Sequence, residues 1–214
     1  LSAAGDIKLG KLRTTNAADL VITSGAIVDV AEGSIDIIAQ TAKLVIQAQG
    51  GVGSVANPIE IDVAALDLRN TGSGEIGLVE AGPLTVTRLE QSSTGAVSLS
   101  TVNGAITVQG AVTATTGAIN LYAGGANGTL VLNADVVSVG GNVDLTADNG
   151  DLNLAAGSRG INVNVNLPKG SLVNAGTLTQ VDNGRGVIAT YKDSWLTVAQ
   201  PGNPTAYHPE IEWI

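Results

Sequence analysis

The sequence predicts an all-β chain wound as a right-handed parallel β-helix, a solenoid with about 22–24 residues per coil. Three observations predict this fold. A short phrase recurs at near-constant spacing, the phrase alternates aliphatic and polar residues, and only 2% of the 214 residues are aromatic. Phe, Met and Cys are absent, so Val, Ile, Leu and Ala, with 28 Gly between them, must build the core. Small aliphatic side chains suit an interior too narrow for aromatic rings.

The recurring phrase is a Gly, a spacer, and then an aliphatic residue, any residue and a second aliphatic residue. The segment GAVSLSTVNGAITV, residues 95–108, holds two copies. Copies begin at Gly5, Gly33, Gly74, Gly82, Gly95, Gly104, Gly117, Gly128, Gly141 and Gly150. Taken two at a time from Gly74, they lie 21, 22, 22, 24, 24 and 22 residues apart. One coil therefore holds two similar strands and a less marked third, as in solenoid proteins.

Each phrase is too short to bury its own apolar side. Because side chains alternate between the two faces of a strand, the aliphatic residues of the phrase point inward and the polar residue points outward. Coiling lays each strand against its equivalent one coil later, so that the aliphatic residues stack along a dry axis. Glycines and the Asn-Gly pairs are expected to supply the corner residues with positive φ.

An antiparallel β-sandwich is the alternative fold. Asn103-Gly104, Asn127-Gly128 and Asn149-Gly150 lie between alternating runs, which is also a strong hairpin signal. We favour the parallel coil, because a series of hairpins has no reason to alternate Asn-Gly and Thr-Gly corners at constant spacing.

The pattern divides the chain into a β-helix over residues 1–190 and a C-terminal segment over residues 191–214. Coils are less regular over 1–73, regular over 74–160 and irregular over 161–190. In the first part, 25–30 and 34–38 carry the phrase, whereas 41–53 and 59–68 are expected to be coils with loop insertions.

The C-terminal segment is expected to cap the solenoid or to dock against another protomer or flanking repeats. An open terminal coil exposes a row of unpaired backbone groups, so it needs a cover. The candidate interface residues are Tyr191, Trp195, Tyr207, Trp213 and Ile214.

Charge and composition exclude several classes of function. The net charge of −9 disfavours nucleic acid and anionic membrane surfaces as partners. No apolar run is long enough for a membrane-spanning helix, so membrane insertion is not expected. Without Cys there is no disulfide scaffold, thiolate metal site or cysteine nucleophile.

Tandem Gly-Ala-Ile-x-Leu repeats with Asn-Gly and Thr-Gly corners resemble the β-helical stalks of bacterial filamentous-haemagglutinin-like exoproteins and related giant surface adhesins. The resemblance covers about residues 74–154, and the repeat motif is less well kept from Gly5 onward and through Val181. It implies a secreted or surface-anchored rod, located outside the cell or on its surface. The chain has no segment that matches a secretion domain or receptor-binding head of such families.

These observations favour a non-enzymatic structural module of an extracellular fibre, adhesin stalk or surface filament. Its expected partners are copies of itself or flanking repeats, joined end to end, with a glycan or a host surface as a further target. No cofactor is expected.

The alternative function is a glycan-binding or polysaccharide-cleaving β-helix. Asp144, Asp148 and Asp151 lie close in sequence, and Asp135 can approach them. However, no Lys or Arg lies between Arg88 and Arg159, and the only aromatic platform in that stretch is Tyr122. The single histidine, His208, lacks a serine motif beside it, so we expect a surface turn residue and no catalytic residues.

Calcium is the one metal that the pattern leaves open. Asp148-Asn149-Gly150-Asp151 brings three oxygen-bearing side chains around a glycine, but it has no Glu at the twelfth position of an EF-hand loop. A corner turn is the default interpretation, with Asp148 and Asp151 as candidates for loose calcium binding.

Overall fold

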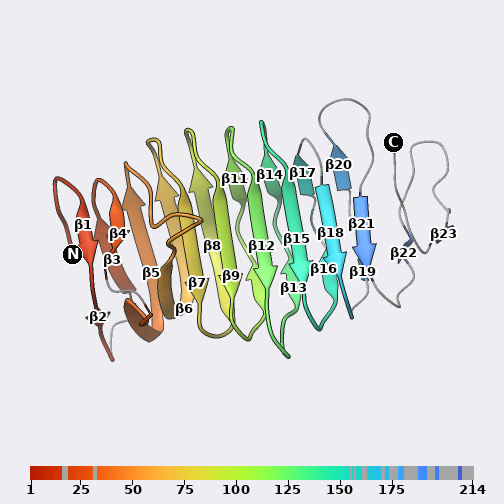
Figure 1. The fold of residues 1–214 in the computed structure, drawn as a ribbon, viewed down its shortest axis with the longest axis horizontal. Coiled ribbons are helices and arrows are strands. Elements are labelled where there is room, and N and C mark those ends of the chain that lie inside the picture. The colour runs from red at the N-terminus through yellow and green to blue at the C-terminus, as the bar shows by residue number, and fades with distance from the viewer. Residues whose placement is uncertain are drawn as a thin grey trace.

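The computed structural model describes residues 1–15, 19–30, 33–154, 156, 158–160 and 163–169, and beyond them the backbone of short strands within 172–208. In this part the chain is all-β and contains no helix. It therefore has no helical segment that could cross a membrane. Parallel strands stack as a β-solenoid of about seven turns. Successive coils follow one another along the long axis, from β1 (Ile7–Leu9) at one end to β21 (Ile188–Tyr191) towards the other (Figure 1).

The strands fall into three columns, here called faces 1, 2 and 3. Face 1 consists of β1, β4 (Ile27–Asp29), β7 (Ile76–Glu80), β9 (Val97–Thr101), β12 (Ile119–Ala123), β15 (Val143–Ala147), β18 (Val163–Leu167) and β21. Face 2 consists of β2 (Leu12–Arg13), the first parts of β5 (Ile37–Ala48), β6 (Ile59–Asn70) and β8 (Leu84–Gln91), then β10 (Ile106–Val108), β13 (Leu130–Leu132), β16 (Leu152–Leu154) and β19 (Leu172–Val173). Face 3 consists of β3 (Asp19–Thr23), the second parts of β5, β6 and β8, then β11 (Val112–Ala114), β14 (Val136–Ser138), β17 (Ser158–Gly160) and β20 (Leu178–Gln180).

The register confirms the predicted period. On face 1, Ile76 pairs with Val97, Val97 with Ile119 and Ile119 with Val143, at spacings of 21, 22 and 24 residues. All of these pairs are parallel, so the antiparallel sandwich is excluded. Among the described strands, the one antiparallel pair is β22 (Leu196–Thr197) with β23 (Tyr207–His208), in the C-terminal segment.

The core is a stack of branched aliphatic side chains, as the phrase predicts. In β9, Val97 and Leu99 are buried, whereas Ser98 and Ser100 are only half-buried on the outer side. The aliphatic positions of the phrase are equally buried in β7, β10, β12, β13, β15 and β16. Because every coil adds the same two or three inward positions, the interior stays narrow and continuous along the axis.

Glycine makes the corner between faces 3 and 1. Gly74 and Gly95 have φ of 116° and 137°, a region that favours glycine. At Gly117 the restriction is space, since a Cβ there would lie 1.9 Å from the carbonyl oxygen of Gly95. The backbones of successive coils therefore touch at this corner.

The Asn-Gly corners, between faces 1 and 2, differ from the prediction. Gly104, Gly128 and Gly150 are not among the glycines with positive φ. A Cβ on Gly104 would lie 2.4 Å from the nitrogen of Pro83 in the preceding coil. Glycine is needed there because the coils approach closely, and not because of its dihedral freedom.

Buried polar side chains line the inside of face 3 at its end. Asn70 accepts a hydrogen bond from the Gly51 N–H (3.2 Å), and Ser138 accepts one from the Gly141 N–H (2.8 Å). Gln91, in the coil after that of Asn70, accepts one from the Ser93 N–H (3.0 Å). These side chains supply partners for corner backbone groups that turn away from the strand ladders.

The first coils are irregular for a different reason than expected. Residues 41–53 and 59–68 fall largely within β5 and β6, two 12-residue strands that each continue into face 3. β5 begins on face 2, whereas β6 begins beside β7 on face 1, where Ile59–Ile61 pair with Leu78–Glu80. The inserted loop is 53–58, which follows Val52, a single bridge residue between Ile27 and Ile76. We call β4 with β5 coil 2, Val52 with β6 coil 3, and β7 with β8 coil 4.

One expected register is wrong. The phrase beginning at Gly33 implied that Ile35 and Ile37 point inward and Asp36 outward. The structure starts β5 at Ile37 and leaves Asp36 fully buried (0% exposed), because the chain is still turning the corner at that residue.

Candidate functional site

Three carboxylates meet at the corner between faces 1 and 2, in coils 2 and 3. Asp29 is the last residue of β4, and its side chain points inward because it alternates with Val28. Asp36 lies directly before β5, and Glu60 is the second residue of β6. The corner is unusual because coil 3 has only Val52 on face 1 before the chain leaves for the inserted loop.

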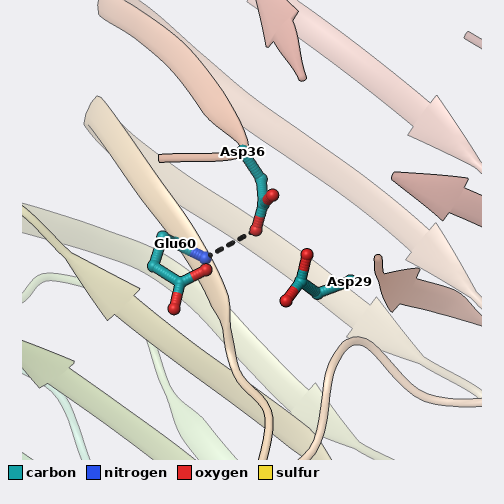
Figure 2. A group of neighbouring side chains, drawn as sticks. All are labelled: Asp29, Asp36 and Glu60. Carbon is teal, nitrogen blue, oxygen red and sulfur yellow. Dashed lines mark hydrogen bonds between the residues drawn. The ribbon is translucent and has the colours of Figure 1, made fainter. Parts of the chain in front are cut away.

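The cluster is held by backbone pairing across the two coils. The Asp36 N–H donates to the Glu60 carbonyl oxygen (2.9 Å), and the Glu60 N–H donates to Asp36 Oδ2 (3.1 Å). One carboxylate oxygen of each of Asp29, Asp36 and Glu60 lies within 4.8 Å of those of the other two. Figure 2 shows the three carboxylates converging on a common point, with the hydrogen bond from the Glu60 backbone to Asp36.

Burial dominates the electrostatics of this cluster. The pKa of the Asp36 carboxyl is raised to about 7, chiefly by loss of hydration. The hydrogen bond from the Glu60 N–H lowers this pKa, whereas the hydrogen bond with the Glu60 side chain and the charges of Asp29 and Glu60 raise it. Asp36 is 0% exposed and Asp29 is 5% exposed, whereas Glu60 is half-buried. The three carboxyl groups therefore share a poorly hydrated corner.

Another buried carboxyl lies at the equivalent corner of coil 4. Glu80, the last residue of β7, is 1% exposed and accepts hydrogen bonds from the N–H groups of Val63 (3.1 Å) and Gly82 (3.0 Å). Burial raises the pKa of Glu80 to about 7, and the charge of Asp62 adds to the rise, while the backbone hydrogen bonds oppose it. Glu80 is thus a capping group for the corner, fixed by backbone donors.

Two shallow hollows mark the outer surface of face 2. One, of about 380 Å³, includes Glu80 and Asp62, and there Gln40 Nε2 donates to Asp62 Oδ2 (2.6 Å). The other, of about 430 Å³, includes Asp151 and Asn149. Neither is lined by an aromatic or a cationic side chain.

The aspartates that the sequence offered for glycan cleavage or calcium, Asp135, Asp144, Asp148 and Asp151, each have an interaction partner in the structure. Asp148 accepts hydrogen bonds from the Tyr122 hydroxyl (2.5 Å) and the Gly125 N–H (3.2 Å), and this contact raises the pKa of Tyr122. Asp144 lies on face 1 and accepts from Asn164 Nδ2 (2.6 Å). Within the described part of the chain, Asp29, Asp36 and Glu60 are the one group of three or more potential ligands that lie close enough to share an ion.

The candidate interface residues lie at the C-terminal end. Tyr191 ends β21 and pairs with Leu167, and Tyr207 pairs with Thr197 in the small antiparallel sheet. His208, expected in a turn, pairs with Leu196 in the same sheet. Trp195, Trp213 and Ile214 lie outside the described residues.

Sequence reasoning missed the carboxylate cluster. Asp29 follows Ile27 by two residues, so the alternation that buries Ile27 also buries Asp29, and this signal is present in the sequence. No comparable signal marks Asp36 or Glu60, since their approach depends on how the chain turns after β4 and returns after the inserted loop.

Comparison of the chain with protein-family models, with curated proteins and with solved structures found no match.

Proposed function

We propose that the chain is a non-enzymatic structural module of an extracellular fibre, adhesin stalk or surface filament. Its task is to make rod length, and its partners are copies of itself or flanking repeats that join it end to end. The observation that carries this proposal is the parallel stack of coils around one aliphatic column.

The stack supports a rod because it has no built-in limit along its axis. Each coil pairs with the next through the same ladders, and each adds roughly 4.8 Å of length. About seven turns thus give a rod of roughly 34 Å. A further coil meets the same backbone groups and the same aliphatic column as the one before it.

The first coil offers an edge for such growth. Among the described strands, β1 pairs only with β4, and β2 pairs only with β5. Unpaired strand edges recruit further strands. We place the other half of the joint in residues 191–214, which carry Tyr191, Trp195, Tyr207, Trp213 and Ile214.

Burial of the carboxyl groups supports a non-enzymatic role. General acid–base catalysis on a polysaccharide needs carboxyl groups that a substrate reaches. The carboxyls of raised pKa, Asp36 and Glu80, are 0% and 1% exposed, and both are engaged by backbone N–H groups. They stabilise corners of the solenoid from the inside.

Electron microscopy of the purified chain at raised concentration tests the proposal. We expect filaments whose axial repeat is a multiple of the length of one chain, roughly 3–4 nm. Monomers that release reducing ends from an anionic polysaccharide would contradict it and favour the glycan-cleaving alternative.

Variants at the C-terminal end test the joint. Trp213→Ala, or removal of residues 211–214, is expected to abolish assembly while the strand signal in circular dichroism is kept. Tyr122→Ala is the matched control, because it removes a partly exposed aromatic ring from face 1 far from that end in the sequence. Filaments that persist in both C-terminal variants would disprove the docking role.

A further inference from the structure

The spacing of the Asp29, Asp36 and Glu60 carboxylates matches the coordination sphere of a calcium ion. Calcium binds oxygen ligands at about 2.3–2.6 Å, so two ligands on opposite sides of one ion lie at most roughly 5 Å apart. One oxygen from each of the three side chains lies within 4.8 Å of the other two. All three are therefore close enough to share a single ion.

Two of the oxygens at this point are buried and lack a hydrogen-bond donor. Asp36 is fully buried, and its Oδ1 accepts no hydrogen bond from any described residue. Glu60 Oε2 is likewise buried without such a bond. Asp36 Oδ2 already accepts from the Glu60 N–H, which fixes the carboxylate beside those of Glu60 and Asp29 (Figure 2). A buried carboxylate oxygen without a partner is costly, and a cation supplies the missing partner.

We propose that Asp29, Asp36 and Glu60 bind one divalent cation, with calcium preferred, and that this ion links coil 2 to coil 3. Each side chain contributes at least one carboxylate oxygen. Glu60 is half-buried, so water reaches the ion from its side and completes the coordination. This proposal does not depend on the rod function proposed above.

Calcium fits better than magnesium for a geometric reason. Magnesium requires ligands at about 2.0–2.1 Å in a nearly ideal octahedron, so opposite ligands lie only roughly 4.2 Å apart. It also gives up its water reluctantly. Carboxylates whose positions are fixed by strand pairing suit the ion that tolerates an irregular arrangement of ligands.

The ion has a structural role that follows from its place in the fold. Coil 3 leaves face 1 after Val52 for the inserted loop, so β4 pairs with coil 3 through a single bridge, Ile27 with Val52, whereas β7 pairs again with Ile59–Ile61 after the loop. The cluster lies beside this gap and joins residues from β4, the turn before β5, and β6. A cation at this point replaces the missing backbone pairs and offsets the repulsion between carboxylates.

The rival account replaces the cation by a proton shared between Asp36 and Glu60. Both accounts neutralise the cluster, but they differ in their dependence on calcium. Calcium titration of the chain after removal of metal by EDTA and dialysis distinguishes them. Isothermal titration calorimetry at pH 7.5 is expected to show one saturable site per chain, and saturating calcium is expected to raise the melting temperature. Magnesium at the same concentration is expected to bind more weakly.

Variants locate the site. Asp36→Asn and Glu60→Gln should each weaken calcium binding by roughly 10–100-fold or more, since even losing a supporting group around a metal has that effect. Asp36→Asn also removes a buried like charge, so without calcium it is expected to be at least as stable as the wild type. If Asp36→Asn loses its strand signal, Glu60→Gln carries the test alone.

The double variant Asp148→Asn/Asp151→Asn examines the other acidic loop, and its calcium affinity should equal that of the wild type. Absence of saturable binding up to millimolar calcium overturns the proposal, and so does binding that survives both cluster variants. Binding that is lost only in the double variant overturns it too, because the site is then the Asp148 loop. Stability that depends on pH but not on calcium indicates the shared proton.

Discussion

Replacement of Glu80 by Gln should remove a strong pH dependence of stability. Glu80 is 1% exposed, and burial raises its pKa from 4.5 to about 7. The folded chain thus binds this proton roughly 300-fold more tightly than the unfolded chain, which corresponds to about 3 kcal/mol. Because the folded pKa is the higher one, the contribution is fully present below pH 4.5 and is lost as the pH rises through about 7.

The assay is urea unfolding of the wild type and of Glu80→Gln between pH 4 and pH 8, with EDTA present throughout. The free energy of unfolding of the wild type should fall relative to that of the variant by up to about 3 kcal/mol over this range. The comparison cancels the titration of Asp36, because both proteins retain it.

Glu80→Leu is the control for the lost hydrogen bonds. It leaves the N–H groups of Val63 and Gly82 without their acceptor, so its stability should be lower than that of Glu80→Gln at every pH. Its pH dependence should nevertheless match that of Glu80→Gln. The reasoning would be refuted if the difference in free energy of unfolding between wild type and Glu80→Gln did not change with pH. It would also be refuted if the wild type gained stability relative to the variant as the pH rises. In either case the hydrogen bonds from the backbone N–H groups would outweigh the effect of burial on the pKa of Glu80.

Two further substitutions test the packing of the coil, both by urea unfolding. Gly117→Ala places a Cβ 1.9 Å from the carbonyl oxygen of Gly95, so we expect the free energy of unfolding to fall by about 3 kcal/mol or more. The control is Gly10→Ala, where no atom lies within 4 Å of the new Cβ, and its free energy of unfolding should change by less than about 0.5 kcal/mol. Equal effects of the two would show that the corner has room. Leu99→Ala leaves a cavity at a fully buried site, so its free energy of unfolding should fall by about 2–5 kcal/mol. Val102 is 62% exposed, so Val102→Ala should change the free energy of unfolding little. A small loss at Leu99 would mean that the column collapses around the gap.

The regular part of the fold could be predicted because its information is local. In the segment from Gly95 to Val108, alternation decides which side chains enter the core, and the repeat period decides which strands pair. Both are visible in the letters of the sequence. Positive φ was predicted correctly at the Thr94-Gly95 corner. At Gly117 and at the Asn-Gly corner of Gly104 the cause was predicted wrongly, since glycine is needed there by the closeness of the neighbouring coil.

The candidate site could not be predicted in the same way. Asp36 and Glu60 are 24 residues apart, and their approach depends on the loop 53–58, which has no counterpart elsewhere in the repeat. The phrase at Gly33 suggested an outward Asp36, and only the position at which β5 begins reverses this. Repeats predict the coils well, and departures from the repeat are where the sequence alone gives least guidance.

The hydrogen bonds that join successive coils run along the length of the rod. A pull applied at its two ends therefore acts on the ladders one winding after another, starting at the weakest. Each winding of about 22 residues would yield roughly 70 Å of slack chain in exchange for about 5 Å of lost rod. A solenoid under tension therefore lengthens by unfolding one winding at a time, and the remaining windings stay folded.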